Sequence, residues 1–154
     1  MMAFLREEDR EALRLRLSDD LAEPVKVTVF SEQSSGLYVP GMRECVSCKE
    51  TEQLMHEVAE LSDQIEVEVV NVKADPATAS EWGVSFTPTI AITDGDQDNG
   101  VRFLGLPAGY EFLSFLETMI SVSQRDGHGL SVETLEKIGS LEEDLDIKVF
   151  STPT

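Results

Sequence analysis

Apolar residues recur at helical spacing in three stretches of the chain. Leu13, Leu17 and Leu21 lie four residues apart among charged residues, and they predict an amphipathic helix over residues 3–21. A second helix is predicted from the i, i+4, i+7 spacing of residues 54, 58 and 61. Beyond Gly109, bulky apolar residues predict a helix with a wide inner face: Phe112, Phe115, Leu116, Met119 and Ile120.

Alternating, β-branched runs separate these helices. They predict strands at residues 25–30 and 65–72, and polar residues on alternate positions give the second strand one wet face. Pro88 can begin a strand but cannot lie inside one, so the next strand is expected at residues 89–93. A loop rich in Asp, Gly and Asn then turns the chain into a hairpin partner at residues 101–104.

A short helix is predicted from Pro76 to Trp82, because Asp75 is a good N-cap and proline is favoured at the first helical position. A right-handed crossover would make the first two strands parallel. We therefore expect an α/β fold: a central mixed sheet flanked by helices, with an extra N-terminal helix. A C-terminal helix-strand extension is expected at residues 131–144 and 146–150.

Composition bounds the class of protein. The chain has 154 residues, 41% of them hydrophobic and 27% charged, which suits one globular core. No apolar run is long enough to span a membrane, and the first residues do not resemble a signal peptide, so we expect a cytoplasmic protein that binds no membrane. The net charge of −18 makes nucleic acid a poor partner. It indicates either a solvated acidic surface or adaptation to high salt.

Cys45 and Cys48 are the only cysteines, and their CxxC spacing permits a disulfide without backbone movement if they begin a helix. Cys45 would then lie at the helix N-terminus, where free N–H groups and the macrodipole favour a thiolate. Cys48, one turn further on, would be the resolving thiol. Glu32, after the first strand, is a candidate proton acceptor for Cys48, although the sequence favours an exposed loop carboxylate.

Two other uses of the cysteines compete with redox chemistry. A zinc site needs about four ligands, and the remaining candidates, His56 and His128, are not at ligand spacing. A purely structural disulfide would close a very short loop and constrain the unfolded chain little. The motif alone leaves redox chemistry and a structural role both open, and the rest of the chain must decide between them. If the pair is redox-active, it needs no metal and no organic cofactor.

The CxxC pair opening a helix after a strand, followed some forty residues later by a proline that opens a strand, resembles the thioredoxin fold. The run Gly-Leu-Pro-Ala-Gly-Tyr-Glu-Phe at residues 105–112 resembles the two-unit, glutaredoxin-like protein disulfide oxidoreductases. That resemblance makes residues 1–124 a thioredoxin-like domain. It makes residues 125–154 a linker and the start of a second, truncated thioredoxin-like unit. The alternative is a stand-alone protein with a C-terminal extension.

The resemblance also implies roles. Cys45 matches the exposed attacking thiol and Cys48 its buried partner. Pro88 matches the cis-proline that faces the disulfide, and Thr87 the preceding residue whose backbone pairs with an extended substrate. The implied partners are proteins that contain disulfides and a reductase that donates electrons.

The chain departs from the family pattern in two places. The loop at residues 31–44 is longer than usual, and Val46 and Ser47 replace the commoner residues between the cysteines. Both departures touch the rim of the active site. The alternative function is a non-catalytic scaffold or docking unit of a larger redox protein.

Overall fold

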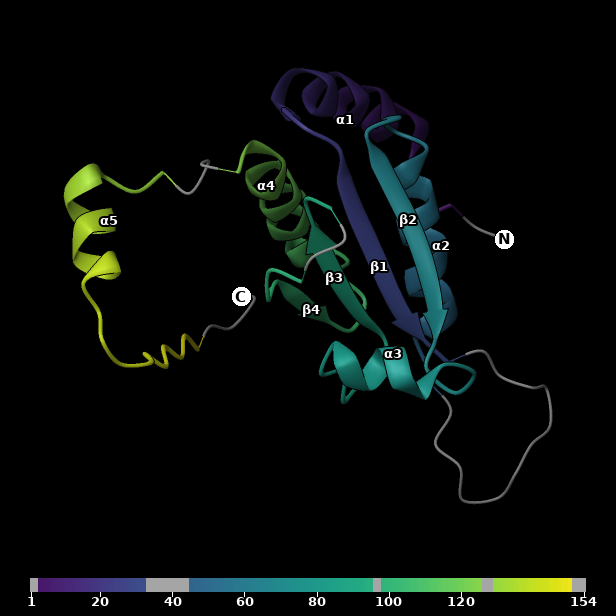
Figure 1. The fold of residues 1–154 in the computed structure, drawn as a ribbon. Coiled ribbons are helices and arrows are strands. Elements are labelled where there is room, and N and C mark those ends of the chain that lie inside the picture. The colour runs from purple at the N-terminus through teal and green to yellow at the C-terminus, as the bar shows by residue number, and fades with distance from the viewer. Residues whose placement is uncertain (1–2, 33–44, 96–97, 126–128, 151–154) are drawn as a thin grey trace.

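The structure is a computed structural model that describes residues 3–32, 45–95, 98–125 and 129–150. It contains a four-stranded sheet in the order β2-β1-β3-β4 (Figure 1). The strands span β1 Val25–Ser31, β2 Ile65–Asn71, β3 Thr89–Thr93 and β4 Arg102–Leu104. The loop predicted at residues 31–44 lies outside the described residues from 33 on.

β1 lies between β2 and β3, and the sheet is mixed as predicted. β1 pairs with β2 in parallel, whereas β3 is antiparallel to both β1 and β4. The predicted parallel pairing of the first two strands and the predicted hairpin are both confirmed. β2 is an edge strand on which Glu66 and Glu68 are exposed, so its predicted wet face is also confirmed.

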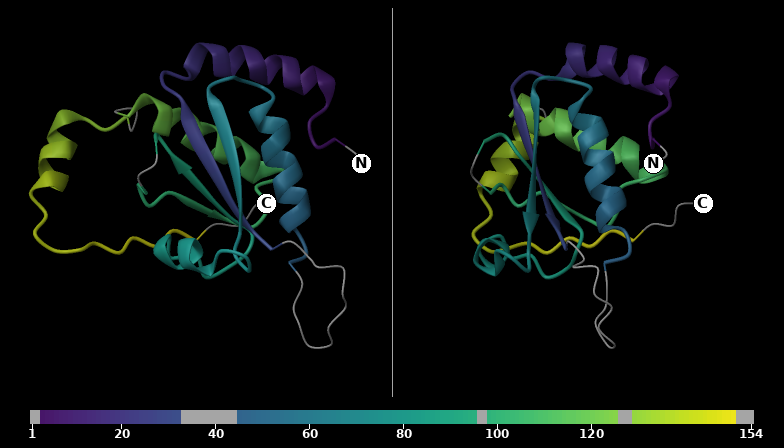
Figure 2. Two further views of the ribbon diagram at one scale, coloured as in Figure 1. Left: turned by 45° about the vertical axis from the view of Figure 1, so that its right-hand side comes forward. Right: turned by 90° about the vertical axis from the view of Figure 1, so that its right-hand side faces the viewer.

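Helices cover the two faces of the sheet unequally (Figure 2). On one face, α1 (Glu7–Asp20), α2 (Cys48–Ala59) and α4 (Tyr110–Gln124) enclose the main core. Alternation along β1 explains this division, because Val25, Val27 and Val29 enter the main core while Phe30 lies on the other face. There Phe30 packs with Ala79 of α3 (Pro76–Glu81) and with Ala91.

Two predicted boundaries are wrong at the cysteine helix and at the C-terminal extension. α2 begins at Cys48 with Ser47 as its N-cap, so Cys45 precedes the helix by three residues. α5 spans only Val132–Gly139, and residues 146–150 form no strand. A strand needs a neighbour for its backbone hydrogen bonds, and this extension lies apart from the sheet in Figure 1.

Candidate functional site

The two cysteines form a disulfide, with 5.5 Å between their Cα atoms. The predicted compatibility of the CxxC spacing with a disulfide is therefore confirmed, although only Cys48 belongs to the helix. Cys48 is buried, Cys45 is half-buried, and Val46 between them is 91% exposed. A substrate approaching from solvent therefore reaches Cys45 more readily than Cys48.

The first turn of α2 fixes the backbone after the disulfide. Both the backbone N–H and the hydroxyl of Thr51 donate to the carbonyl of Ser47, at 2.9 and 2.7 Å. This bonding makes Cys48, and not Cys45, the first helical residue. The positive end of the helix macrodipole therefore lies at Cys48. The disulfide holds Cys45 close to that end of the helix.

Glu32 contacts three parts of the site. Its backbone N–H donates to Sγ of Cys48 at 3.3 Å. Its carboxylate accepts a hydrogen bond from the hydroxyl of Thr87 at 3.0 Å and forms an ion pair with Lys73 at 2.7 Å. The side chain is only 21% exposed, so the interpretation as an exposed loop carboxylate is wrong.

The charge of Glu32 is favoured by this environment. The Lys73 ammonium lowers the pKa of the Glu32 carboxyl below its ordinary value, while partial burial raises it and the Thr87 hydroxyl lowers it further. The net effect lowers the pKa of Glu32, so the side chain is a carboxylate at neutral pH. It accepts hydrogen bonds there and carries no proton to donate.

Thr87 and Pro88 lie immediately before β3, and the peptide bond between them is cis. Pro88 is buried, and its carbonyl accepts the backbone N–H of Gly105 at 2.9 Å. The hydroxyl of Thr89 donates to the carbonyl of Phe86 at 2.7 Å. Through Glu32, this segment is connected to Cys48, so the structure links all the residues that the sequence selected at one end of the sheet.

Exposed apolar side chains adjoin the predicted site residues. Phe86 is 68% exposed directly before Thr87, and Val46 lies between the cysteines. Phe86 also lines a pocket of about 320 Å³ together with Leu104, which is paired with Thr89 across the hairpin. The site therefore exposes one apolar side chain between its cysteines and another directly before Thr87.

Lys73 was not selected from the sequence. The signal was present in the strand register, because Ser31 of β1 lies opposite Asn71 of the parallel strand β2. Parallel strands bring their carboxyl ends to the same edge of a sheet, as Figure 1 shows for these two. Residues one or two positions further along, Glu32 and Lys73, therefore meet there.

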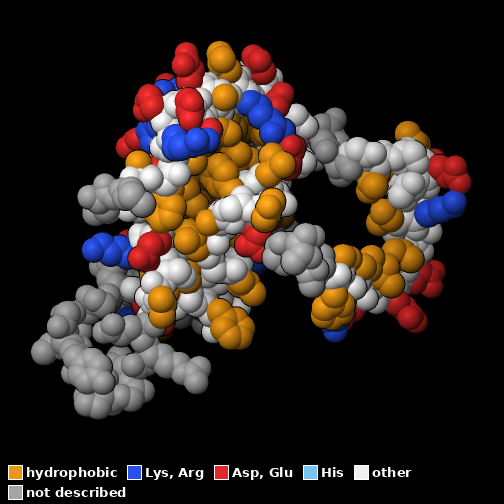
Figure 3. Space-filling model, turned by 180° about the vertical axis from the view of Figure 1, so that it is seen from behind, with side chains coloured by type: hydrophobic (Ala, Val, Ile, Leu, Met, Phe, Trp, Pro, Cys, Tyr) orange, Lys and Arg blue, Asp and Glu red, His pale blue; other side chains and the backbone are white. Residues whose placement is uncertain are grey.

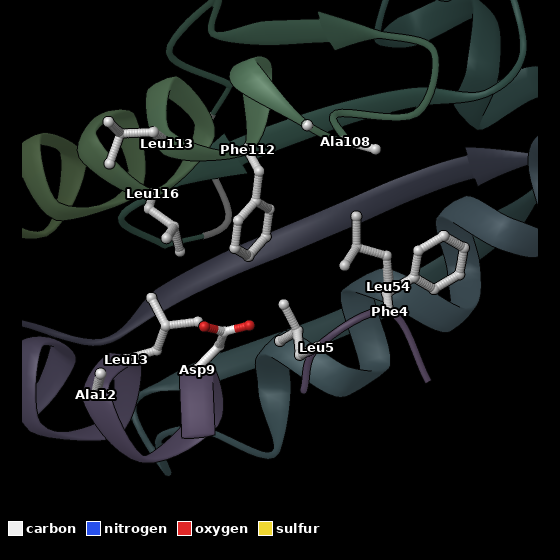
Figure 4. A pocket seen from close by; sticks show the side chains of 11 residues that line it. Phe4, Leu5, Asp9, Ala12, Leu13, Leu54, Ala108, Phe112, Leu113 and Leu116 are labelled. Carbon is white, nitrogen blue, oxygen red and sulfur yellow. The ribbon is translucent and has the colours of Figure 1, made fainter. Parts of the chain in front are cut away.

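A second concavity lies between α1, α2 and α4, and has a volume of about 440 Å³ (Figure 4). Apolar side chains such as those of Leu13, Leu54 and Phe112 line it. Among the described residues that line it, only Asp9 has an ionisable side chain. The described residues that line this pocket include no thiol, hydroxyl or imidazole, so we place the candidate site at the disulfide.

The described part of the chain shows neither a metal site nor a membrane span. Within it, no group of three or more His, Cys, Asp or Glu side chains is arranged to hold a metal ion. His128, the second histidine considered as a zinc ligand, lies outside the described residues. Of the helices within the described ranges, none is long and apolar enough to cross a membrane.

Comparisons with known proteins agree with this geometry. A family model described as a thioredoxin domain matches residues 38–117, more than half of the 154 residues. A thioredoxin from Methanocaldococcus jannaschii is 41% identical over 64 residues, which cover 41% of this chain and 69% of the relative. The F subunit of alkyl hydroperoxide reductase in Staphylococcus aureus is 24% identical over 109 residues, which cover 71% of this chain and 19% of the relative.

Solved structures extend the match to most of the chain. A protein disulfide oxidoreductase from Aeropyrum pernix superposes with a TM-score of 0.73 and 29% identity, covering 92% of this chain and 56% of that protein. The F subunit of alkyl hydroperoxide reductase in Enterococcus faecalis superposes with a TM-score of 0.74 and 21% identity, covering 90% and 61%. This chain thus spans less than two thirds of either structure.

The family match falls on the segment that carries the chemistry, since residues 38–117 contain both cysteines, Thr87 and Pro88. The fold around them is the mixed sheet with helices on both faces that the solved relatives share. The disulfide between Cys45 and Cys48 supplies the redox group. The chain therefore belongs to the thioredoxin-domain family.

Proposed function

We propose that this chain exchanges disulfides with protein substrates through Cys45 and Cys48. The observation that carries the proposal is the disulfide between a half-buried Cys45 and a buried Cys48, at the start of α2. An accessible sulfur beside a protected one suits a two-step exchange, in which one thiol meets the substrate and the other completes the reaction.

In the reducing direction, the Cys45 thiolate attacks one sulfur of a substrate disulfide. The substrate disulfide breaks, a Cys45-substrate disulfide forms, and one substrate thiolate leaves. Cys48, as its thiolate, then attacks Sγ of Cys45 and releases the second substrate thiolate. Two electrons have passed to the substrate and the Cys45–Cys48 disulfide is restored, while solvent protonates the released thiolates. The oxidising direction is the reverse.

The apolar surroundings favour a protein segment over a small thiol as the preferred substrate. Val46 and Phe86 expose large apolar side chains on the two segments that carry the predicted site residues. Thr87, between Phe86 and the cis-proline, would pair with the backbone of the bound segment, in the manner of β-strand addition. The proposed substrate is thus an extended chain with apolar residues beside its disulfide.

The proposal includes an electron donor and a compartment. Turnover as a reductant consumes the dithiol, so a separate reductase must restore it. The similarity to the F subunit of alkyl hydroperoxide reductase supports a partner of the reductase class. A reactive cysteine pair of this kind suits the cytoplasm, where thiol pools keep such pairs in exchange.

We also propose the two-part organisation of residues 1–124 and 125–154. The solved relatives extend well beyond the part that this chain matches, and residues 129–150 hold apolar side chains that no described neighbour covers. Figure 3 shows such side chains gathered on the extension. They would pack within the second thioredoxin-like unit, of which residues 125–154 are the linker and the start.

The test is a single-turnover assay with insulin as the protein disulfide. The pre-reduced wild type should reduce insulin, Cys45→Ser should abolish the reaction, and Cys48→Ser should accumulate a mixed disulfide that is visible on a non-reducing gel. Alkylation across pH should give Cys45 a pKa below the ordinary thiol value of about 8.5.

The rival function is a scaffold or docking unit. It predicts an ordinary Cys45 thiol and the same insulin reduction, or lack of it, in wild type and both serine variants. That result would overturn the proposal and move the chemistry to another part of the redox protein.

A further inference from the structure

Glu32 stands where three segments of the site meet. It follows β1, its backbone N–H reaches Cys48 at the start of α2, and its carboxylate reaches both Thr87 and Lys73. The two carboxylate oxygens are used separately, since Oε1 accepts from Thr87 and Oε2 faces the Lys73 ammonium. Glu32 therefore connects Thr87, through its side chain, to the buried sulfur of Cys48, through its backbone N–H.

We propose that Glu32, held by Lys73, is a positioning residue that fixes Thr87 beside the disulfide and thereby sets the affinity for extended protein substrates. This inference rests on the proposed function, because it assigns Glu32 to the binding step of that same exchange. Neither residue is a nucleophile here, and neither needs to contact the reacting sulfurs through its side chain.

Lys73 is itself fixed, which makes it a suitable anchor. It lies two residues after β2, and its backbone N–H donates to the side chain of Asn71 at 3.1 Å. Its ammonium then occupies one oxygen of Glu32. A carboxylate held at one oxygen cannot rotate freely, so its other oxygen keeps a defined position for the hydroxyl of Thr87.

The pair contributes to binding more than to folding. Lys73 is 45% exposed, and ion pairs exposed to solvent contribute little to stability. Positioning has a different consequence, because a binding segment that is already ordered loses less entropy when a ligand arrives. Two flanking hydrogen bonds also order this segment. The Pro88 carbonyl accepts the N–H of Gly105, and the Thr89 hydroxyl donates to the carbonyl of Phe86.

The favoured ionised state of Glu32 agrees with this role, since an anionic oxygen is a stronger acceptor for the Thr87 hydroxyl than a neutral one. A substrate long enough to lie along Thr87 gains from the fixed segment. A small disulfide that reaches only Cys45 gains less. Loss of the Glu32–Thr87 hydrogen bond should therefore change the relative KM values of these two substrates.

The experiment measures kcat and KM for insulin and for oxidised glutathione with the wild type and a set of variants. Glu32→Ala and Thr87→Val each remove the hydrogen bond between these two side chains. The double variant removes the same single hydrogen bond. Glu32→Gln keeps an acceptor oxygen for Thr87 without the ion pair. Glu68→Ala is the matched control, since Glu68 forms a comparable ion pair with Lys26, elsewhere on the sheet.

We expect Glu32→Ala and Thr87→Val to raise the KM for insulin about fivefold relative to the KM for oxidised glutathione, the effect of about one hydrogen bond. The double variant should be no worse than the worse single variant, because both changes break the same bond. Glu32→Gln should fall between Glu32→Ala and the wild type, and Glu68→Ala should leave the ratio of the two KM values unchanged.

Several results would overturn the inference: KM ratios like that of Glu68→Ala, additive losses in the double variant, or a Glu32→Gln variant as impaired as Glu32→Ala. Thermal unfolding of each variant checks that it is folded, and Glu32→Gln, which keeps the shape of the side chain, serves if Glu32→Ala does not fold. A wild type that reduces neither substrate refutes the proposed function instead, so the two failures are distinguishable.

Discussion

The Glu57 carboxylate accepts a hydrogen bond from the backbone N–H of Leu5 at 3.0 Å, although 52 residues separate them in the chain. Its oxygens also accept the N–H of Phe4 at 3.0 and 3.1 Å and the amide of Gln53 at 2.8 Å. Glu57 is a buried acid on α2. It therefore secures the segment that leads into α1, the helix that lies before the first strand.

Replacing Glu57 with Ala should destabilise the protein by about 2–3 kcal/mol, because it leaves the N–H groups of Phe4 and Leu5 without their charged acceptor. Urea unfolding at neutral pH measures the change. Glu60→Ala is the control, since Glu60 is exposed and its ion pair with Arg10 should contribute below about 1 kcal/mol. Equal losses of unfolding free energy in the two variants would show that the hydrogen bonds of Glu57 stabilise the protein no more than the exposed ion pair of Glu60.

Acid should remove the contribution of Glu57. Burial alone would raise the pKa of Glu57, but hydrogen bonds from Leu5, Gln53 and Phe4 and the charge of Arg10 bring it below the ordinary value of 4.5. A lowered folded pKa stabilises the native state at pH values above 4.5, and that stability is lost as the pH falls through the folded pKa.

The free energy difference between wild type and Glu57→Gln isolates this effect, because the general loss of negative charge in acid affects both proteins. The wild type should be the more stable at pH 7, and the difference should shrink on acidification from pH 4.5 downward. A difference that stays constant down to about pH 2 would contradict the pKa direction.

Salt should stabilise this protein. Its formal net charge of −18 opposes compaction through self-repulsion, and raising NaCl from about 0.1 to about 1 M shortens the Debye length from about 10 to about 3 Å. We expect Tm to rise by a few degrees, since about 1 kcal/mol corresponds to roughly 2–4 °C at this size. Scanning calorimetry measures it, and an unchanged or lower Tm would mean that attractive ion pairs dominate the surface charge.

The regular elements followed from local patterns in the sequence. The alternation of polar and apolar residues predicted β1 and β2, and Pro88 predicted the start of β3. The helical spacing of apolar residues predicted the helices that cover the main core. These features depend on one face being buried and the other wet, which the residue order records directly. The cysteine pair was found for a different reason, because no other cysteine competes with it.

The details that the sequence did not reveal depend on neighbours distant along the chain or on local bonding. The boundary of α2 depends on the bonds of Thr51 to Ser47, and helix ends are commonly displaced by a residue or two. The role of Glu32 depends on the register that brings Lys73 beside it. Residues 146–150 have a strand-like pattern, but a pattern cannot supply the partner strand that hydrogen bonding requires.

Arg102→Met should lower stability by about 1–2 kcal/mol. The Arg102 guanidinium lies 5.1 Å from the ring centre of Trp82, donates to the Trp82 carbonyl at 3.2 Å and pairs with Asp98. Trp82 is the only tryptophan, so its emission should shift in the folded variant. Arg125→Met, which breaks a more exposed pair with Asp94, is the control and should leave the emission unchanged.

Ending the chain after Arg125 should leave the stability of the thioredoxin-like domain nearly unchanged. No residue of α5 is buried, whereas Ser123 and Gln124 of α4 are bonded to the end of α1, through Ala22 and Asp20. We expect Tm to stay within about 2 °C, a stability change of at most about 1 kcal/mol. The apolar side chains of residues 129–150 are exposed, so their removal should also reduce the binding of a hydrophobic dye.

The 154-residue chain measured under the same conditions is the reference for both readouts. Substituting Val132 and Ile138 of α5 with Ser in the full chain is the milder variant, and it should lower dye binding in part at the same Tm, because both side chains are exposed. A large fall in Tm after truncation would instead show that the extension packs on the domain. Residues 125–154 would then belong to the first unit and would not begin a second one.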